Sequence, residues 1–254
     1  MKWLAGGLWR LAPFVFVIAI WYLVRWSGLV APGLLPAPHE VALTLVALLR
    51  GGSYLLDIWL SVQRVLLGLV FGMILAVPVG FMIGWNKQLR RFFDPLINFF
   101  RALPPIALIP LVIVYLGIGE VAKVAILFYA SFFAAVIVMY EGMSQISPIY
   151  IKVSRTLGAS DWEIFAKVIV PLTLPHVLTA ARVALGVAWA TLVAAELVAA
   201  QHGLGAVIQN ASSFFNLKVI YAGIITIGFF ALLMDSLLRA LSRRFLAWQD
   251  SHAQ

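Results

Sequence analysis

The sequence predicts an all-α polytopic membrane protein with six transmembrane helices. Of its 254 residues, 63% are hydrophobic and only 11% are charged, and the mean hydropathy is +1.03. A soluble domain of this length could not bury that much apolar surface, so lipid must solvate most of the chain. Six apolar segments and an uneven distribution of basic residues between them complete the prediction.

The apolar segments set the order of the predicted helices, because a spanning helix needs about 20 mostly apolar residues. Their uncharged cores are Leu11–Val24, Val65–Asn86, Ala102–Gly119, Val124–Tyr140, Val183–Ala195 and Val219–Met234. The first core follows Lys2 and Arg10 and resembles a signal peptide, but no small-x-small cleavage pattern comes after it. We therefore expect it to be retained as a helix.

This order divides the chain into four regions. They are an N-terminal helix (1–30), an outer connecting segment (31–63), a core of five helices (64–245) and a cytoplasmic tail (246–254). The stretch Pro32–Leu60 is too polar and too broken by proline to span the membrane. Within it, the apolar run Val41–Leu49 predicts a short helix at the outer surface or packed on the bundle.

The basic residues set the predicted orientation. With the N-terminus inside, 13 of the 18 Lys and Arg residues fall on the cytoplasmic side, Arg101 among them. Positive charge is enriched in cytoplasmic loops, so we expect both termini to lie in the cytoplasm. The same loops account for the net charge of +8 without a nucleic-acid partner. No basic residue falls in the middle of a predicted span.

One sizeable polar insert occurs after the first hundred residues, at Ser147–Pro175, and we name it the polar elbow. Its first half predicts a short helix, because Ser147 can cap it and Pro148 suits its opening position. Gly158 is placed to end that helix in the left-handed conformation. The orientation above puts the polar elbow in the cytoplasm.

The second half of the polar elbow predicts another short helix. Ser160 and Glu163 have the spacing of a capping box, and Pro171 should interrupt the helix that follows. Trp162 and Phe165 offer large, rigid anchors of the kind that dominate protein interfaces. We expect a contact with another protein. The alternative is an amphipathic hairpin at the headgroups, with Trp162 in the aromatic belt.

The polar elbow resembles a signature of permease subunits of bacterial ATP-binding-cassette importers. In that signature, Glu-Ala-Ala precedes a glycine, and nine residues separate the glycine from Ile-x-Leu-Pro. The likeness lies at Gly158, Ala159, the apolar Val168 and Val170, and Pro171. The opening departs from the pattern, because Lys152-Val153-Ser154 stands in place of Glu-Ala-Ala.

The likeness extends from about Leu35 to the arginine pair near the C-terminus. The run Arg101–Glu120 resembles the third span of the sulfonate, taurine and nitrate permease family. Gly186–Glu196, followed by Gly203-Leu204-Gly205, resembles its fifth span and outer loop. Within the family, we expect the taurine permease to be the nearest relative.

The resemblance implies a type I importer permease fold, in which the polar elbow is a coupling helix seated in a groove of a separate ATPase subunit. It implies ATPase-coupling roles for Arg155, Gly158, Ala159, Ser160, Asp161, Trp162, Glu163, Phe165 and Pro171. It also implies a homodimer in the bacterial inner membrane, two ATPase subunits inside, and a periplasmic or lipid-anchored substrate-binding protein outside.

The chain itself shows no Gly-rich phosphate loop followed by lysine, so we expect ATP and Mg to bind the partner ATPase. We expect no catalytic residue, no metal site and no cofactor in this chain. The implied solute is a small anion such as taurine or another alkanesulfonate; nitrate, bicarbonate or a thiamine precursor are alternatives.

The third and fifth spans are the expected walls of the solute pathway. The candidate residues are Pro105, Pro110, Tyr115, Trp189, Thr191 and Glu196. Prolines break the backbone hydrogen bonds of the third span, which favours contact with protein or water, although a kinked buried helix would also explain them. Glu196 is an intramembrane carboxylate and hence a candidate functional residue, with hydration or backbone pairing as the alternative.

Two smaller patterns predict packing and ion pairing, and the absence of other patterns bears on the class of function. Gly68 with Gly72, and Gly80 with Gly84, predict close helix packing, within the chain rather than at a dimer seam. Asp235 and Arg239 predict an ion pair one turn apart. A secondary carrier or channel would show internal repeats or a series of ionisable residues, and neither is visible. A scaffold subunit without a pathway is the remaining alternative.

Overall fold

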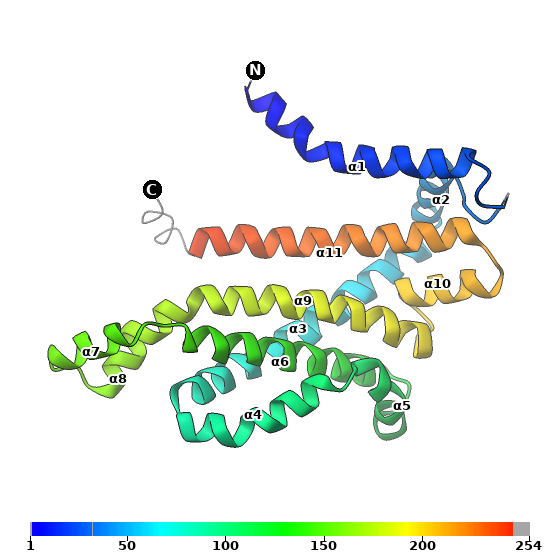
Figure 1. Cartoon of the computed structure of the whole chain (residues 1–254). Helices are drawn as coiled ribbons and strands as arrows, with labels where there is room; N and C mark the ends of the chain where they lie inside the picture. The colour runs from blue at the N-terminus through cyan, green and yellow to red at the C-terminus, as the bar shows by residue number, and fades with distance from the viewer. Residues whose placement is uncertain (1, 32, 246–254) are drawn as a thin grey trace.

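The fold is entirely helical, as the sequence predicts, in a computed structural model that describes residues 2–31 and 33–245 (for residues 2–11 and 245, the backbone alone). The helices are α1 (Lys2–Trp26), α2 (Pro38–Arg50), α3 (Ser53–Trp85), α4 (Lys87–Ala102), α5 (Pro105–Leu116), α6 (Glu120–Ser144), α7 (Pro148–Thr156), α8 (Asp161–Ile164), η1 (Phe165–Ile169), α9 (Val170–Ala199), α10 (Leu204–Ser213) and α11 (Leu217–Phe245) (Figure 1). The predicted tail, residues 246–254, lies outside the described residues.

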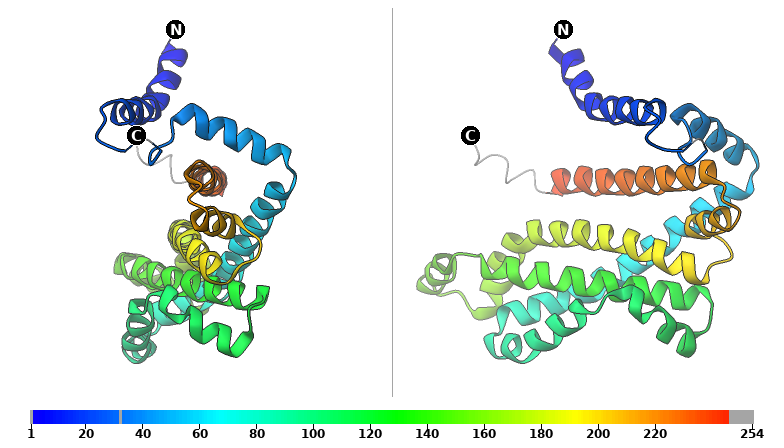
Figure 2. Two further views of the ribbon diagram at one scale, coloured as in Figure 1. Left: turned by 90° about the vertical axis from the view of Figure 1, so that its right-hand side faces the viewer. Right: turned by 45° about the vertical axis from the view of Figure 1, so that its right-hand side comes forward.

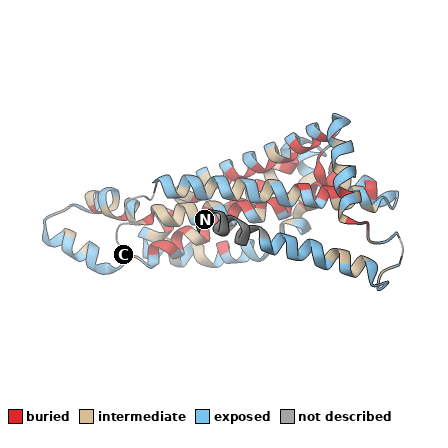
Figure 3. Ribbon diagram, turned by 90° about the horizontal axis from the view of Figure 1, so that it is seen from above, coloured by how far each residue is buried: buried red, intermediate tan, exposed pale blue. Residues whose placement is uncertain are grey.

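Helices α3, α6 and α9 pack together as the centre of the bundle. Helix α11 packs on α9, α10 and α2, while α1 lies on the outside and contacts α2 (Figure 2). The core consists of inward-facing side chains such as Val65, Leu127 and Leu192, all of which are fully buried. Figure 3 shows the buried residues following the inner faces of these helices, as expected where the outer faces meet lipid.

Glycines allow α3 and α6 to approach closely. A Cβ atom built on Gly68 or Gly80 would lie only 2.4 Å from the Cβ atom of Leu127 or Met139, respectively. Gly72 and Gly84 meet Ser131 and Met143 of α6 in the same way. All four glycines therefore pack within the chain, which confirms that prediction.

The number of candidate spans is smaller than the six predicted. Among the described residues, four helices are long and apolar enough to cross a membrane: Ser53–Trp85, Glu120–Ser144, Asp161–Ala199 and Leu217–Arg244. Helices α4 and α5 would add a fifth as one broken span, bent by 91°. The apolar helix Ala12–Trp26 of α1 is shorter. The described chain thus supports four or five spans.

The third predicted span, Ala102–Gly119, has the wrong bounds. Pro104 and Pro105 have no N–H group to donate, so the chain turns there, and only α5 lies within the predicted range. The candidate broken span instead includes α4, whose lysine and arginine residues were counted on the cytoplasmic side. Helix α4 places its charged and apolar residues on opposite faces, a pattern that a search for uncharged runs misses.

The outer connecting segment contains the predicted short helix, α2, packed on α11 and α3. Its last residues differ from the prediction, because Ser53–Leu60 is already part of α3. Glu40 ties α2 to α11: its carboxylate accepts the Ala37 N–H at 2.9 Å and pairs with Lys218 at 3.1 Å. The Ala37 N–H and then Lys218 lower the pKa of Glu40.

Candidate functional site: the polar elbow and a buried ion-pair cluster

The polar elbow forms two short helices, with the predicted caps. The Ser147 hydroxyl accepts the Ile149 N–H at the start of α7, and Gly158 has a left-handed φ of +84° just after it. At the start of α8, the Ser160 hydroxyl accepts the Glu163 N–H at 3.3 Å, and the Ser160 N–H donates to the Glu163 carboxylate at 3.1 Å. Side-chain and backbone hydrogen bonds thus fix the turn locally.

The polar elbow projects beyond the ends of its neighbouring helices (Figures 1 and 2). Its base is anchored by Ile164, which is buried beside Met143. The ring of Phe165 packs edge-on against Phe81 and Trp85 of α3, at 5.6 and 5.7 Å between centroids. The far side is open, and Trp162 is 72% exposed. One face therefore holds the elbow to the bundle, while the other is free to meet a partner.

A π-helical turn joins the polar elbow to α9. The Val170 N–H bonds the Phe165 carbonyl five residues back, rather than four. Pro171 follows directly and has no N–H for the Lys167 carbonyl, which favours this wider turn. Pro171 does not end the helix as predicted, since one helical segment runs from Asp161 to Ala199. The second half of the elbow is thus continuous with the predicted fifth span.

The nine residues expected to couple to an ATPase all lie in this segment, on α7, α8, η1, the turn between α7 and α8, and the start of α9. Arg155 pairs with Asp161 at 3.0 Å across the turn, and Glu163 pairs with Lys167 at 3.0 Å. Both pairs are exposed, so they contribute little to folding and leave charge available to a partner. The coupling role itself stays a prediction.

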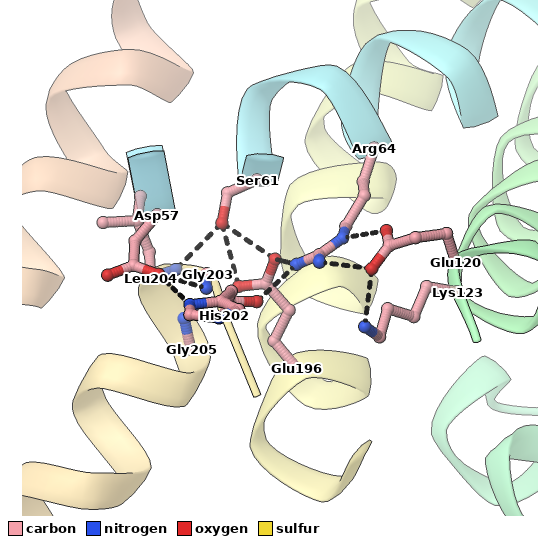
Figure 4. Close-up of polar contacts among 10 residues, drawn as sticks. All are labelled: Asp57, Ser61, Arg64, Glu120, Lys123, Glu196, His202, Gly203, Leu204 and Gly205. Atoms are coloured by element: carbon pink, nitrogen blue, oxygen red, sulfur yellow. Dashed lines mark hydrogen bonds and ion pairs between the residues drawn. The ribbon is translucent and has the colours of Figure 1, made fainter. Parts of the chain in front are cut away.

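A second polar site lies at the opposite end of the bundle, where α3, α6 and α9 meet (Figure 4). Arg64 donates from Nη1 to Oε1 of Glu196 at 2.6 Å, and its Nε and Nη2 bind the two carboxylate oxygens of Glu120 at 2.6 Å each. Lys123 also binds Glu120, at 2.9 Å. The side chains of Arg64 and Glu196 are 3% and 0% exposed. We call this group the ion-pair cluster.

The ion-pair cluster holds the loop between α9 and α10. Glu196 accepts the Gly205 N–H at 2.8 Å, and Arg64 donates to the His202 carbonyl at 2.7 Å. Ser61 donates to Glu196 at 2.8 Å and accepts the Leu204 N–H at 2.9 Å. Three helices and this loop are thus joined by one network.

Gly203 is the residue of this loop that tolerates least change. Its φ is +128°, and a Cβ atom there would lie 2.5 Å from Oε1 of Glu196. Its N–H donates to Asp57 at 2.8 Å. The network contains carboxylates, cations and one hydroxyl, and each is held by the others. This arrangement suits a fixed clamp rather than bond-making chemistry.

The structure separates the six residues expected to line a pathway into two groups. Pro105, Pro110 and Tyr115 lie on α5, where Tyr115 is 77% exposed. Trp189, Thr191 and Glu196 are buried on α9. Their part in a pathway stays a prediction. Among the described residues, no cluster of three or more His, Asp or Glu side chains is placed to hold a metal ion.

Two functional features were missed from sequence alone. Arg64 was only counted among the five basic residues of the outer side, although a single arginine directly before a long apolar run is a signal for a paired intramembrane charge. The predicted Asp235–Arg239 pair is confirmed at 2.8 Å, but Asp235 also binds Arg182 of α9 at 2.9 Å. Both omissions concern partners that are distant in sequence.

Comparisons with known proteins agree with this architecture. Residues 68–247 match the model of a family described as binding-protein-dependent transport system inner membrane component. A probable ABC transporter permease protein of Brucella abortus (strain 2308) is 45% identical over 241 residues, 95% of each chain. The taurine transport system permease protein TauC of Escherichia coli (strain K12) is 35% identical over 91% of this chain and 86% of its own.

The Brucella protein is therefore more similar to this chain than the taurine permease, which corrects the nearest relative named from sequence. Among solved structures, an inward-facing MetNI methionine ABC transporter chain aligns with a TM-score of 0.66. It is 22% identical, and the alignment covers 75% of this chain and 95% of that one. At this identity, the likeness establishes the fold alone.

Proposed function

The chain belongs to the family of binding-protein-dependent transport system inner membrane components, and from this membership we propose that it moves a small anionic solute toward the cytoplasm. It is a multi-pass inner-membrane protein and the non-catalytic permease subunit of an ABC importer. The proposed solute is taurine or a related alkanesulfonate, supported by the relative that carries this name. Nitrate, bicarbonate or a thiamine precursor are the alternatives.

The proposed assembly has two copies of this chain, two ATPase subunits and one external binding protein. The ATPases bind ATP and Mg, and they sit on the side of the polar elbow. In this arrangement both termini are cytoplasmic, and the ion-pair cluster lies at the outer end. The uneven distribution of basic residues supports this orientation.

The single observation that carries the proposal is the geometry of the polar elbow. It exposes Trp162 beyond the bundle, while Ile164 and Phe165 anchor it to α3 and α6. Because α8 continues into α9, a force on the elbow reaches a central helix directly. A rigid element with one anchored and one open face can transmit the closing of two ATPase subunits.

The test is Gly158→Leu, which forces a leucine into a left-handed conformation at φ +84°. Gly52→Leu is the matched control, because Gly52, between α2 and α3, has a φ of +80° and equally open surroundings. We expect Gly158→Leu to insert normally but to lose co-purification with the ATPase, whereas Gly52→Leu keeps it. Equal retention of the ATPase by both variants would contradict the coupling role.

The solute is tested in proteoliposomes that contain the complete importer and labelled taurine. ATP-dependent uptake that excess nitrate or bicarbonate does not suppress would support the sulfonate assignment. Suppression by one of these ions would favour that alternative. Uptake by this chain alone, driven by an ion gradient without ATPase, would instead identify a secondary carrier.

A further inference from the structure

Arg101 lies within the broken span formed by α4 and α5, not at its end. It is near the middle of the pair Lys87–Ala102 and Pro105–Leu116, which together are long and apolar enough to cross a membrane. The count of basic residues along the sequence placed it instead at the cytoplasmic boundary. An arginine inside a span is costly unless it faces protein, water or an anion.

The neighbouring helix gives the depth of Arg101. The Tyr129 hydroxyl of α6 donates to the carbonyl of Phe100, the residue before Arg101. With a rise of 1.5 Å per residue, Tyr129 is about 13 Å from the Glu120 end of α6 and about 22 Å from the Ser144 end. Because the apolar core of a bilayer is about 30 Å thick, Arg101 lies well inside it.

Arg101 opens onto a groove between helices. The cavity has a volume of about 430 Å³, and its walls come from the α4–α5 junction, α6 and α9. The lining includes Arg101, Tyr129, Phe133, Glu141, Val183 and Val187. A space of this size suits a small organic molecule, and it lies beside the two helices expected to bound the pathway.

Among the described residues, Arg101 has neither a hydrogen-bond partner nor a carboxylate within 4.0 Å, although Glu141 lines the same groove. Two arginines in other spans are held by carboxylates: Arg64 by Glu120 and Glu196, and Arg182 by Asp235. Arg91, nearer the Lys87 end of α4, has no ion pair within the described part of the chain. The guanidinium of Arg101 carries five N–H donors, and inside a span they need a partner. Its planar guanidinium matches the oxygens of a carboxylate or sulfonate.

We propose that Arg101 binds the oxyanion group of the transported solute, and that the groove is the binding site of that solute within the membrane. This inference rests on the proposed function. The aromatic and aliphatic walls would hold a short hydrocarbon part, while the guanidinium holds the charged end. Glu141 is twelve residues, about 18 Å along the axis of α6, from Tyr129, and it lines the groove without forming an ion pair with Arg101.

The absence of cysteine from the chain allows a direct test. A single cysteine at Val183, an exposed residue of the groove wall, is treated in membranes with sulfonatoethyl or trimethylammonioethyl methanethiosulfonate. The first reagent is a small sulfonate, and the second is a cation of similar size. We expect Arg101→Gln to lower the ratio of anionic to cationic labelling by about five- to tenfold. Arg101→Lys should keep most of it.

The control is a cysteine at Leu157, which is 81% exposed on the polar elbow, where the ratio should not depend on residue 101. An unchanged ratio at Val183 in Arg101→Gln would overturn the proposal, as would failure of both reagents to reach Val183. The labelling requires neither ATPase nor ATP. Failure of the proposed function would appear in the Gly158→Leu experiment instead, so the two failures are distinguishable.

Discussion

Arg64 on α3 and Glu196 on α9 form a buried ion pair of 2.6 Å, although 132 residues separate them in the chain. Glu196 in turn accepts the N–H of Gly205 at 2.8 Å, in the loop that follows α9. The position of this loop therefore depends on a charge carried by another helix. In the proposed orientation, the pair joins α3 to α9 at the outer end of the bundle.

Arg64→Met should destabilise the protein by about 3–5 kcal/mol, because it leaves the fully buried carboxylate of Glu196 without its cation. Glu196→Gln should cost less, since an amide can still bond Ser61 and Arg64. Thermal unfolding in lipid nanodiscs would rank the two variants. A melting temperature for Arg64→Met equal to that of the wild type would show that the ion-pair cluster contributes nothing to folding.

Gly68→Ala should strongly impair folding, because its new Cβ would lie 2.4 Å from the Cβ of Leu127 and 3.1 Å from backbone. Helices α3 and α6 would have to separate, and their contact forms the centre of the bundle. Gly228→Ala in α11 is the matched control, since a Cβ there meets nothing within 4 Å. The yield of monodisperse protein after detergent extraction measures the difference. Equal yields would rule out a steric need for Gly68.

Local patterns were the part of this structure that the sequence could predict. The caps at Ser147 and Ser160, the turn at Gly158 and the glycine packing of α3 each depend on residues a few positions apart or on one helix face. Pairings such as Arg64 with Glu196 depend on the whole fold, so no local pattern contains them.

The predicted bounds of the third span were wrong at α4 for a different physical reason. Its charges lie on one face of an amphipathic helix, so the segment looks polar in any count of charged residues. The span boundaries and the depth of Arg101 were misplaced for that reason.

The turn at Pro171 was misread because a helix can accommodate a proline by widening one turn as well as by ending.

Trp162→Ala should weaken binding of the ATPase by about 2 kcal/mol, roughly 30-fold, without changing thermal stability. The side chain is 72% exposed, so its removal leaves no cavity in the bundle, but a large aromatic anchor is lost from the open face. Trp59→Ala, at an equally apolar residue that is 61% exposed on α3, serves as the control. Titration of labelled ATPase onto nanodiscs gives both affinities. Equal affinities would exclude Trp162 from the interface.

Pro171→Ala should uncouple ATP hydrolysis from uptake while leaving the protein folded. Alanine restores an N–H that can bond the Lys167 carbonyl, so the π-helical turn can tighten into an α-helix. An α-helical turn holds about one residue fewer than the π-helical turn it would replace. The segment before it would therefore rotate by about 100° about the helix axis. Phe165 would then leave its contacts with Phe81 and Trp85, and the open face of the polar elbow would turn away from the ATPase.

The measurement is the amount of solute taken up per ATP hydrolysed by the complete importer. We expect this ratio to fall in Pro171→Ala. The fall should be accompanied either by ATP hydrolysis faster than normal or by weaker association of the ATPase. Pro175→Ala is the matched control, because Pro175 lies one turn further along the same helix, beyond the π-helical turn. A ratio that is unchanged in Pro171→Ala, or lowered equally in both variants, would contradict this prediction. The π-helical turn would then only accommodate the proline and would not couple the ATPase to α9.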